Sequence, residues 1–254
     1  MTAQRVEDGS SYGWRARIGL ILPADNVLME PELYELALPG VSFHGLRLTS
    51  TDHAEMRRQA LELAEAVKEL GLDAVVYACA ETSFNGGDGV RRTLSEEIAQ
   101  VCGVPVVTAT NALLAALEHT GAKKIAVATP YTAVSGEILE QTLADHGLEI
   151  TDSVHRDFRL ESQDPREWFL TNRQPSSLVY GMARSLDSAE ADTIVLVSTN
   201  WTTLQVIEPL EQDTGKRVLT TNQSILWWLM RKLSFRQPDL GLGALFNESA
   251  ETGA

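Results

Sequence analysis

The sequence repeats one pattern of apolar runs, and this internal repeat constrains the fold more than any other feature. The runs Arg17–Pro23 and Lys124–Pro130 each start with a basic residue, continue through mostly apolar residues and end at a proline. Further along each copy, the runs Asp73–Cys79 and Asp192–Ser198 start with an aspartate and reach a thiol or a hydroxyl six positions later. A chain that repeats its apolar runs in this way is expected to build two similar lobes.

The spacing of the apolar residues predicts an α/β fold. Continuous apolar runs such as 74–78 are typical of strands that are buried on both faces of a parallel sheet. Between such runs, apolar residues recur at helical spacing, most clearly over 55–70, and Gly71 follows as a stop signal. Strands that alternate with helices predict two pseudo-symmetric lobes, each a parallel sheet flanked by helices, with the active site in the cleft between them.

The order of these segments gives the expected elements and boundaries. Strands are expected at residues 17–23, 41–48, 73–79, 104–108, 124–130, 149–158, 192–198 and 215–220. Helices are expected at residues 29–38, 55–70, 94–102, 111–120, 135–146 and 178–186, and the strands at 104–108 and 215–220 each precede a helix that starts at an asparagine. The predicted organisation is a flexible arm at 1–16, a first lobe at 17–120, a second lobe at 121–235 and a tail at 236–254.

Composition excludes several classes of partner. The 254 residues include 35 Asp and Glu against 21 Lys and Arg, and this net charge of −14 argues against nucleic-acid binding, which needs a basic surface. No apolar stretch approaches the roughly 20 residues of a membrane span, and residues 1–17 lack the apolar core of a signal peptide, so we expect a cytoplasmic protein with no membrane partner. The two cysteines form neither a disulfide framework nor a zinc site, and no metal is expected. The pair Trp227–Trp228 is expected in the core or at a lobe or subunit interface, so a homo-oligomer is possible.

Cys79 is the candidate reactive group. It ends a predicted strand, and ligands bind at the carboxyl ends of strands in open α/β sheets. Thr82 and Ser83 follow it and could present hydroxyl and N–H groups to a carboxylate. A buried and inert cysteine is the alternative, since thiol reactivity depends on local pKa and exposure. If the lobes face each other, Ser198 lies across one cleft from Cys79.

These motifs resemble the aspartate/glutamate racemase superfamily, within it the branch of maleate cis-trans isomerases and arylmalonate decarboxylases. The resemblance covers about residues 17–233 and is carried by Arg17–Ile21 with Pro23 and Asn26, Met29–Pro31, Asp73–Cys79, Thr129–Thr132 and Ser198–Leu204. It implies two pseudo-symmetric lobes, no metal, no organic cofactor, and cysteine thiols that flank a small carboxylate substrate. By position, Cys79 corresponds to the first-lobe cysteine of the family, and Ser198 stands where the family has its second-lobe cysteine. The residues that the resemblance or adjacency assigns to holding the substrate are Asn26, Thr82, Ser83, Tyr131, Thr132, Asn172, Thr199 and Asn200.

A thiol that faces a hydroxyl favours some of these activities over others. Two-base racemisation needs two groups with pKa values near neutral, and a serine hydroxyl is far too weak an acid. The five histidines fall in segments away from the two strand ends, so none is expected to assist. Isomerisation by thiolate addition to a C=C bond needs one nucleophile, which Cys79 could supply with a pKa below the ~8.5 of a free cysteine.

Decarboxylation also needs a single thiol, as proton donor, but the familiar decarboxylases of this branch keep the second-lobe cysteine rather than the first. We therefore predict a cofactor-independent isomerase of a small carboxylate. An arylmalonate decarboxylase-like enzyme and a non-catalytic carboxylate-binding protein are the alternatives. Glu81 is unusual beside an anion pocket, so either it points away or the substrate carries an amine or a hydroxyl.

Overall fold

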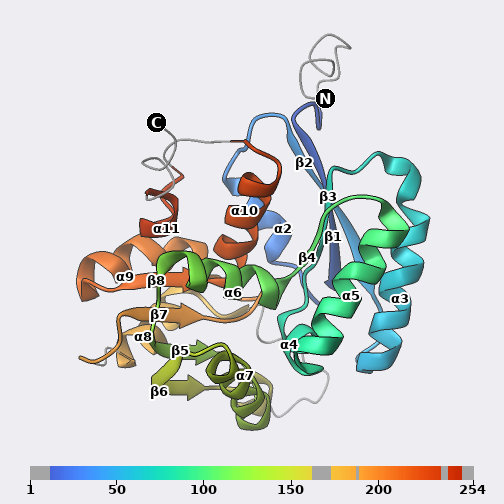
Figure 1. Cartoon of the computed structure of the whole chain (residues 1–254). Helices are drawn as coiled ribbons and strands as arrows, with labels where there is room; N and C mark the ends of the chain where they lie inside the picture. The colour runs from blue at the N-terminus through green and yellow to red at the C-terminus, as the bar shows by residue number, and fades with distance from the viewer. Residues whose placement is uncertain (1–11, 162–172, 187–188, 236–239, 248–254) are drawn as a thin grey trace.

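Two four-stranded parallel sheets form the centres of two lobes (Figure 1). The computed structural model describes residues 12–161, 173–186, 189–235 and 240–247. In the first sheet the strand order is β2-β1-β3-β4, with β1 Ala16–Pro23, β2 Val41–Leu48, β3 Ala74–Tyr77 and β4 Val106–Thr108. In the second sheet the order is β6-β5-β7-β8, with β5 Lys124–Thr129, β6 Glu149–His155, β7 Thr193–Leu196 and β8 Arg217–Thr220. The two orders correspond strand for strand, which confirms the predicted α/β fold with two pseudo-symmetric lobes.

Helices connect the strands and cover the sheets (Figure 1). Those between strands of the first lobe are α2 Met29–Glu35, α3 His53–Ala66, α4 Ala80–Phe84 and α5 Gly87–Cys102, and α6 Ala109–Thr120 leads into the second lobe. The later helices are α7 Ala133–Asp145, α8 Ser176–Ser185, α9 Ile207–Thr214, α10 Thr221–Lys232 and α11 Ala244–Asn247. Short 3₁₀ turns lie at η1 Lys68–Leu70, η2 Phe158–Glu161 and η4 Leu204–Val206. None of the helices in the described residues has both the length and the apolar character to cross a membrane.

The repeated aspartates have the same role in both lobes. The Asp73 carboxylate accepts the backbone N–H of Arg17 at 2.8 Å, and the Asp192 carboxylate accepts the N–H of Lys124 at 2.8 Å. In return, the backbone N–H of each aspartate donates to the carbonyl of the same basic residue, again at 2.8 Å in both lobes. Each aspartate therefore fixes the register between two central strands, because a one-residue slip would break both bonds.

The repeated glycines explain a second echo in the sequence. Gly103 ends α5 with φ +69° and Gly215 ends α9 with φ +67°, a left-handed conformation that favours glycine. The helices that follow β4 and β8 differ from the prediction, because their first residues are not asparagines. Thr108 and Thr220 cap them instead, and each threonine oxygen accepts the N–H three residues later. Helix α5 also begins at Gly87, seven residues before the expected start.

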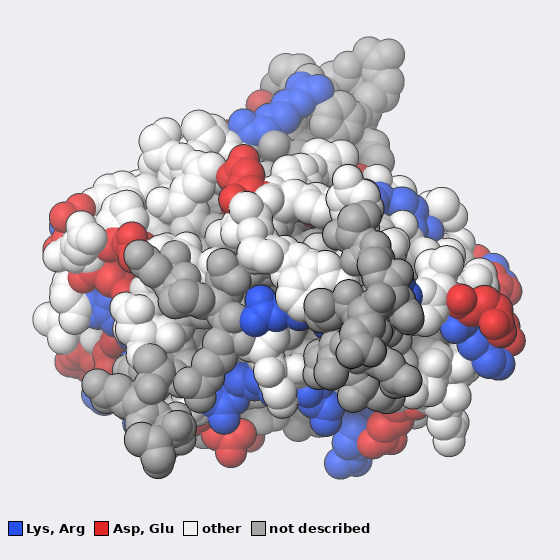
Figure 2. All heavy atoms as spheres, turned by 90° about the horizontal axis from the view of Figure 1, so that it is seen from above, with Lys and Arg blue, Asp and Glu red and all other residues white. Residues whose placement is uncertain are grey.

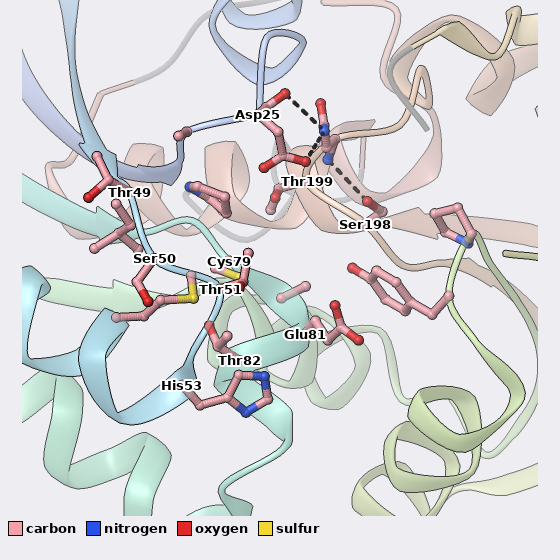
Figure 3. Close-up of a pocket in the computed structure, with 18 of the residues that line it drawn as sticks. Asp25, Thr49, Ser50, Thr51, His53, Cys79, Glu81, Thr82, Ser198 and Thr199 are labelled. Carbon is pink, nitrogen blue, oxygen red and sulfur yellow. Dashed lines mark hydrogen bonds between the residues drawn. The ribbon is translucent and has the colours of Figure 1, made fainter. Parts of the chain in front are cut away.

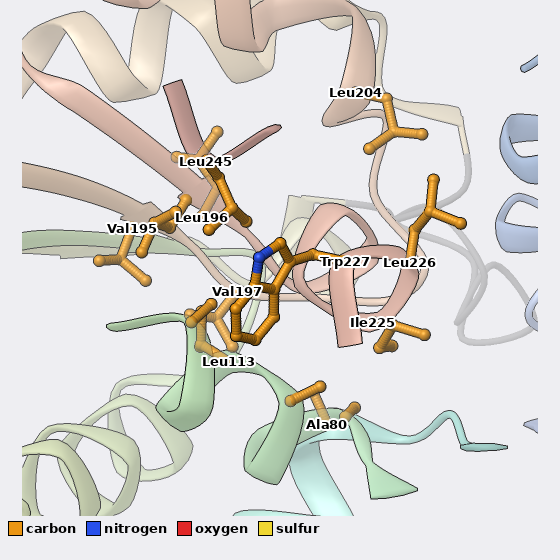
Figure 4. Close-up of a cluster of buried hydrophobic side chains, with 14 of the residues drawn as sticks. Ala80, Leu113, Val195, Leu196, Val197, Leu204, Ile225, Leu226, Trp227 and Leu245 are labelled. Carbon is orange, nitrogen blue, oxygen red and sulfur yellow. The ribbon is translucent and has the colours of Figure 1, made fainter. Parts of the chain in front are cut away.

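One apolar core joins the two lobes. Trp227 of α10 is 6% exposed and lies with Leu113 of α6 and Val197 in a single cluster (Figure 4). The Trp227 indole also stacks at a tilt on His119 of α6, with 5.0 Å between ring centroids. The predicted position of Trp227 in the core or at a lobe interface therefore agrees with the structure, since α6 and α10 belong to different lobes.

Each predicted lobe segment contains one sheet, and the exact domain boundaries stay a prediction. Residues 1–11 of the predicted arm, and 236–239 and 248–254 of the predicted tail, lie outside the described residues. On the face in Figure 2, the described Lys and Arg side chains lie dispersed among acidic and neutral ones. That the protein does not bind nucleic acid stays a prediction from its charge.

Candidate active site

A pocket of about 340 Å³ lies between the lobes, at the carboxyl ends of the central strands. The loops after β1, β2 and β3 form its first-lobe wall, and the loops after β5 and β7 with η2 form its second-lobe wall. Its polar lining residues are Asp25, Thr49, Ser50, Thr51, His53, Cys79, Glu81, Thr82, Tyr131, Arg159, Ser198, Thr199 and Asn200. Figure 3 shows Cys79 and Thr82 on one side of this space and Ser198 on the other.

Cys79 lies where β3 gives way to α4. It is the residue that caps this helix, and it is 8% exposed. As a helix cap the Cys79 side chain accepts no hydrogen bond, but the nearby hydroxyl and backbone N–H of Thr82 lower the pKa of its thiol. Burial nevertheless raises the pKa of the Cys79 thiol to about 11, and the negative charges of Glu81 and Asp25 add to this effect. The expectation of a lowered pKa is therefore wrong, because the sequence could not show how deeply this thiol is buried.

Tyr77 hydrogen-bonds the Thr82 hydroxyl, which lies near the Cys79 thiol. The Tyr77 phenol lies 2.8 Å from the Thr82 hydroxyl, and Tyr77 itself is 1% exposed. Because Thr82 has a single hydroxyl proton, directing that proton at the sulfur leaves its oxygen to accept from the Tyr77 O–H. Burial raises the pKa of Tyr77, so the phenol stays protonated and can donate. Donation from the Tyr77 O–H to Thr82 therefore leaves the Thr82 proton available to the sulfur of Cys79.

Ser198 occupies a different environment on the opposite wall. Its hydroxyl oxygen accepts the backbone N–H of Asn200 at 3.1 Å, and its side chain lies near the Tyr131 phenol. Burial, followed by the charge of Glu81, raises the pKa of Tyr131 well above its usual value. Neither contact is with a base, so the Ser198 hydroxyl here is a hydrogen-bonding group rather than an activated proton carrier.

The charged groups of the pocket were not assigned to the site from the sequence. Burial raises the pKa of Asp25, with Arg159 opposing the rise and Glu81 adding to it. The Arg159 guanidinium binds Asp157 through two hydrogen bonds of 2.7 and 2.9 Å. Glu81 does not point away, since it lines the pocket and its carboxylate accepts the Ser135 hydroxyl at 2.6 Å. The position of Glu81 two residues after Cys79 was the one available signal.

The interpretation that all five histidines lie away from the strand ends is wrong for His53. This residue begins α3, and its side chain is exposed on the pocket wall (Figure 3). The loop from β2 to α3 lines the same pocket as the residue after β3, which no local pattern in the sequence indicates.

Six of the predicted site residues line this one pocket, and three of the other four make hydrogen bonds within the protein instead. Those in the pocket are Cys79, Thr82, Tyr131, Ser198, Thr199 and Asn200. Asn26 is 1% exposed, with its amide N–H donating to Thr199 at 3.1 Å and its oxygen accepting the N–H groups of Leu28 and Met29.

Two further predicted residues stabilise helices. Ser83 is buried and donates its hydroxyl to the Ala80 carbonyl at 2.8 Å. Thr132 caps α7 by accepting the Ser135 N–H at 3.1 Å. Asn172 lies outside the described residues. The described residues contain no group of three or more His, Cys, Asp or Glu side chains that could hold a metal ion.

The chain matches the family model described as arylmalonate decarboxylase over residues 18–246. A maleate isomerase from Nocardia farcinica is 28% identical over 257 residues, which cover 94% of this chain and 98% of the relative. A maleate isomerase from Geobacillus stearothermophilus is 25% identical, covering 91% of this chain and 97% of the relative. Among solved structures, Nocardia farcinica maleate cis-trans isomerase superposes with a TM-score of 0.82 at 25% identity, covering 92% of this chain and 99% of that one. Arylmalonate decarboxylase gives 0.78 at 22% identity, covering 91% and 99%, and shows the same fold.

Proposed function

We propose, from the premise that this chain belongs to the arylmalonate decarboxylase family, that it is a cysteine-dependent isomerase of a small unsaturated carboxylate with Cys79 as nucleophile. The observation that carries the proposal is the position of Cys79, at a strand end in the pocket between the lobes, with the hydroxyl and the backbone N–H of Thr82 near its sulfur. The maleate isomerases among the relatives support it. A solved structure of a cysteine-to-serine variant of the Nocardia farcinica enzyme carries a covalently bound succinylcysteine intermediate.

The proposed reaction begins and ends with the same thiolate. Cys79 loses its proton, and its sulfur forms a bond to one alkene carbon while the π electron pair moves onto the carbon next to a carboxylate. Rotation about the resulting single bond is followed by return of the electron pair, which restores the C=C bond in the trans form and expels the thiolate. The Thr82 N–H and O–H stabilise the thiolate in both steps, and Tyr131, Ser198, Thr199 and Asn200 are proposed to bind the carboxylate.

Forming the thiolate is the demanding step. With a pKa of about 11, ionising Cys79 at pH 7 costs about 5 kcal/mol. Asp25, His53 and Glu81 are the titratable groups on the pocket wall that can accept the proton. This free energy is compatible with ordinary turnover, because it is a fraction of the barrier of a reaction with kcat near 10 per second, roughly 16 kcal/mol.

The protonated state of Cys79 favours one second candidate, a decarboxylase in which the thiol acts as an acid. There the C–C bond to a carboxylate breaks, CO₂ leaves, and the electron pair stays on the substrate as an enediolate. The Cys79 S–H then delivers its proton to that carbon, and solvent returns a proton to the thiolate. A raised pKa keeps such a donor in its acid form.

Proton NMR in D₂O separates these functions. Parent protein and Cys79→Ala are incubated with maleate, maleamate and substituted malonates. An isomerase converts a cis alkene into its trans isomer, whereas a decarboxylase yields a product deuterated at the former malonate carbon. We expect isomerisation, and a loss of at least about 1,000-fold in Cys79→Ala, because the covalent step is removed. Activity in the variant within about tenfold of the parent would show that Cys79 is not the nucleophile. A cytoplasmic location and a homo-oligomeric state stay predictions.

A further inference from the structure

The pocket wall carries two carboxylates beside the proposed nucleophile. Asp25 follows β1, and Glu81 lies in the first turn of α4 (Figure 3). After burial, which is the larger effect, the negative charges of both residues raise the pKa of Cys79 on one wall and of Tyr131 on the other. Their electrostatic field therefore covers the space in which a substrate must lie.

Little positive charge in the pocket compensates for these carboxylates. Among the described lining residues, Arg159 is the one Lys or Arg, and its guanidinium already binds the Asp157 carboxylate at two points. Glu81 is oriented by the Ser135 hydroxyl at 2.6 Å, a neutral donor that fixes the carboxylate without cancelling its charge. Like charges held close together repel, so a doubly charged substrate is disfavoured here.

On the basis of the isomerase function proposed above, we propose that the substrate is a carboxylate with one negative charge and a nitrogen that donates hydrogen bonds, as in the monoamide of a dicarboxylic acid. Asp25 and Glu81 select it by accepting its N–H groups. Such charge-assisted hydrogen bonds are about twice as strong as neutral ones, and they are unavailable to a second carboxylate, which has no proton to donate. The residues proposed above to bind a carboxylate, Tyr131, Ser198, Thr199 and Asn200, then have a single carboxylate to hold.

Maleate and maleamate form a matched pair for the test, because they differ only in an oxygen replaced by NH₂. Both are assayed by NMR at pH 8, where both carboxyls of maleate are ionised. We expect the parent to convert maleamate with a kcat/KM at least about tenfold above that for maleate. Glu81→Gln and Asp25→Asn should each move this ratio about tenfold toward maleate, since each removes one repelling charge. Glu118→Gln, an exposed carboxylate of α6, is the matched control and should leave the ratio unchanged.

Binding to the Cys79→Ala protein separates this proposal from the proposed reaction. Calorimetric titration with the two compounds measures selectivity without turnover, and we expect maleamate to bind more tightly than maleate. A parent that prefers maleate, a ratio that neither variant changes, or equal binding of the two compounds would overturn the substrate proposal while leaving the isomerase intact. If the parent turns over neither compound but Cys79→Ala still prefers maleamate, the reaction is wrong and the selectivity stands. Absence of binding by either compound overturns the selectivity as well.

Discussion

The buried carboxylate of Glu32 makes the stability of this fold depend on pH. Glu32 lies on α2 of the first lobe and is 5% exposed. It accepts the backbone N–H groups of Thr203 and Leu204 at 2.9 and 3.2 Å, and the Asn222 amide at 2.8 Å. All three donors belong to the second lobe. Burial raises the pKa of Glu32 from 4.5 to about 7, although these hydrogen bonds oppose the rise.

The direction of the effect follows from the order of the two pKa values. Below pH 4.5 the carboxyl is protonated in both the folded and the unfolded chain, so its titration does not change stability. Between pH 4.5 and 7 the unfolded chain releases its proton while the folded chain retains it, and the free energy of unfolding falls. Above pH 7 both states are ionised, and the accumulated loss is about 3 kcal/mol, at 1.36 kcal/mol for each pKa unit.

Glu32→Gln isolates this contribution. Glutamine keeps an oxygen for the two backbone N–H groups, and the Asn222 oxygen, which has no hydrogen-bond partner among the described residues, can turn toward the new NH₂ group. Urea unfolding is measured from pH 4.5 to 8. We expect the free energy of unfolding of the variant, minus that of the parent, to rise by about 3 kcal/mol across this range. Glu118→Gln, on the surface, should show no such rise.

The reasoning is refuted if the difference between Glu32→Gln and the parent stays constant within about 0.5 kcal/mol over that range. Such a result would mean that the three donors stabilise the ionised carboxylate as well as water does. The stability of the parent would then not depend on the protonation of Glu32 at any pH in the range.

Two further variants test the unequal surroundings of the two repeated positions. Tyr77→Phe removes the hydrogen bond to Thr82, and we expect the alkylation rate of Cys79 at pH 9 to fall about threefold. The reason is that losing a hydrogen bond worth about 0.7 kcal/mol lowers the fraction of Cys79 present as thiolate. An unchanged rate would assign Tyr77 a packing role alone. Ser198→Cys should gain exchange of a substrate α-proton with D₂O, followed by NMR on 2-aryl propionates or aspartate, since a thiol carries protons near neutral pH and a hydroxyl does not. If the new thiol is titrated by a disulfide reagent yet no exchange above the parent is seen, Ser198 does not face the substrate carbon.

The fold and the place of the pocket were predictable because they depend on local patterns and general rules. Asp73 and Asp192 mark equivalent strands, and both make the same pair of bonds to the neighbouring strand. Once the strands are known to be parallel, the rule that ligands bind at their carboxyl ends places Cys79 and Ser198 at one pocket. The family match over residues 18–246 confirms the resemblance that these motifs suggested.

The orientation of individual polar side chains was harder to predict. Asn26 and Thr132 both precede a helix, and short polar side chains there often bind backbone N–H groups instead of a ligand. That capping pattern was visible in the sequence. The raised pKa of Cys79 and the arrival of His53 at the pocket depend on how distant segments pack, which the sequence does not specify locally.

The asymmetry of the pocket bears on the stereochemistry of the proposed reaction. The repeat supplies two equivalent strand ends, yet one carries a thiol near Thr82 and the other a hydroxyl that accepts a backbone N–H and lies near Tyr131. A reaction that transfers protons on both faces of a planar carbon needs an acid and a base on opposite sides, and the Ser198 side lacks either near neutral pKa. Addition and elimination differ in this respect, because the sulfur attacks and leaves on one face while rotation of the substrate changes its geometry. The two lobes share their backbone arrangement but differ in these side chains. The pocket between them is therefore better suited to isomerising a double bond than to inverting a stereocentre.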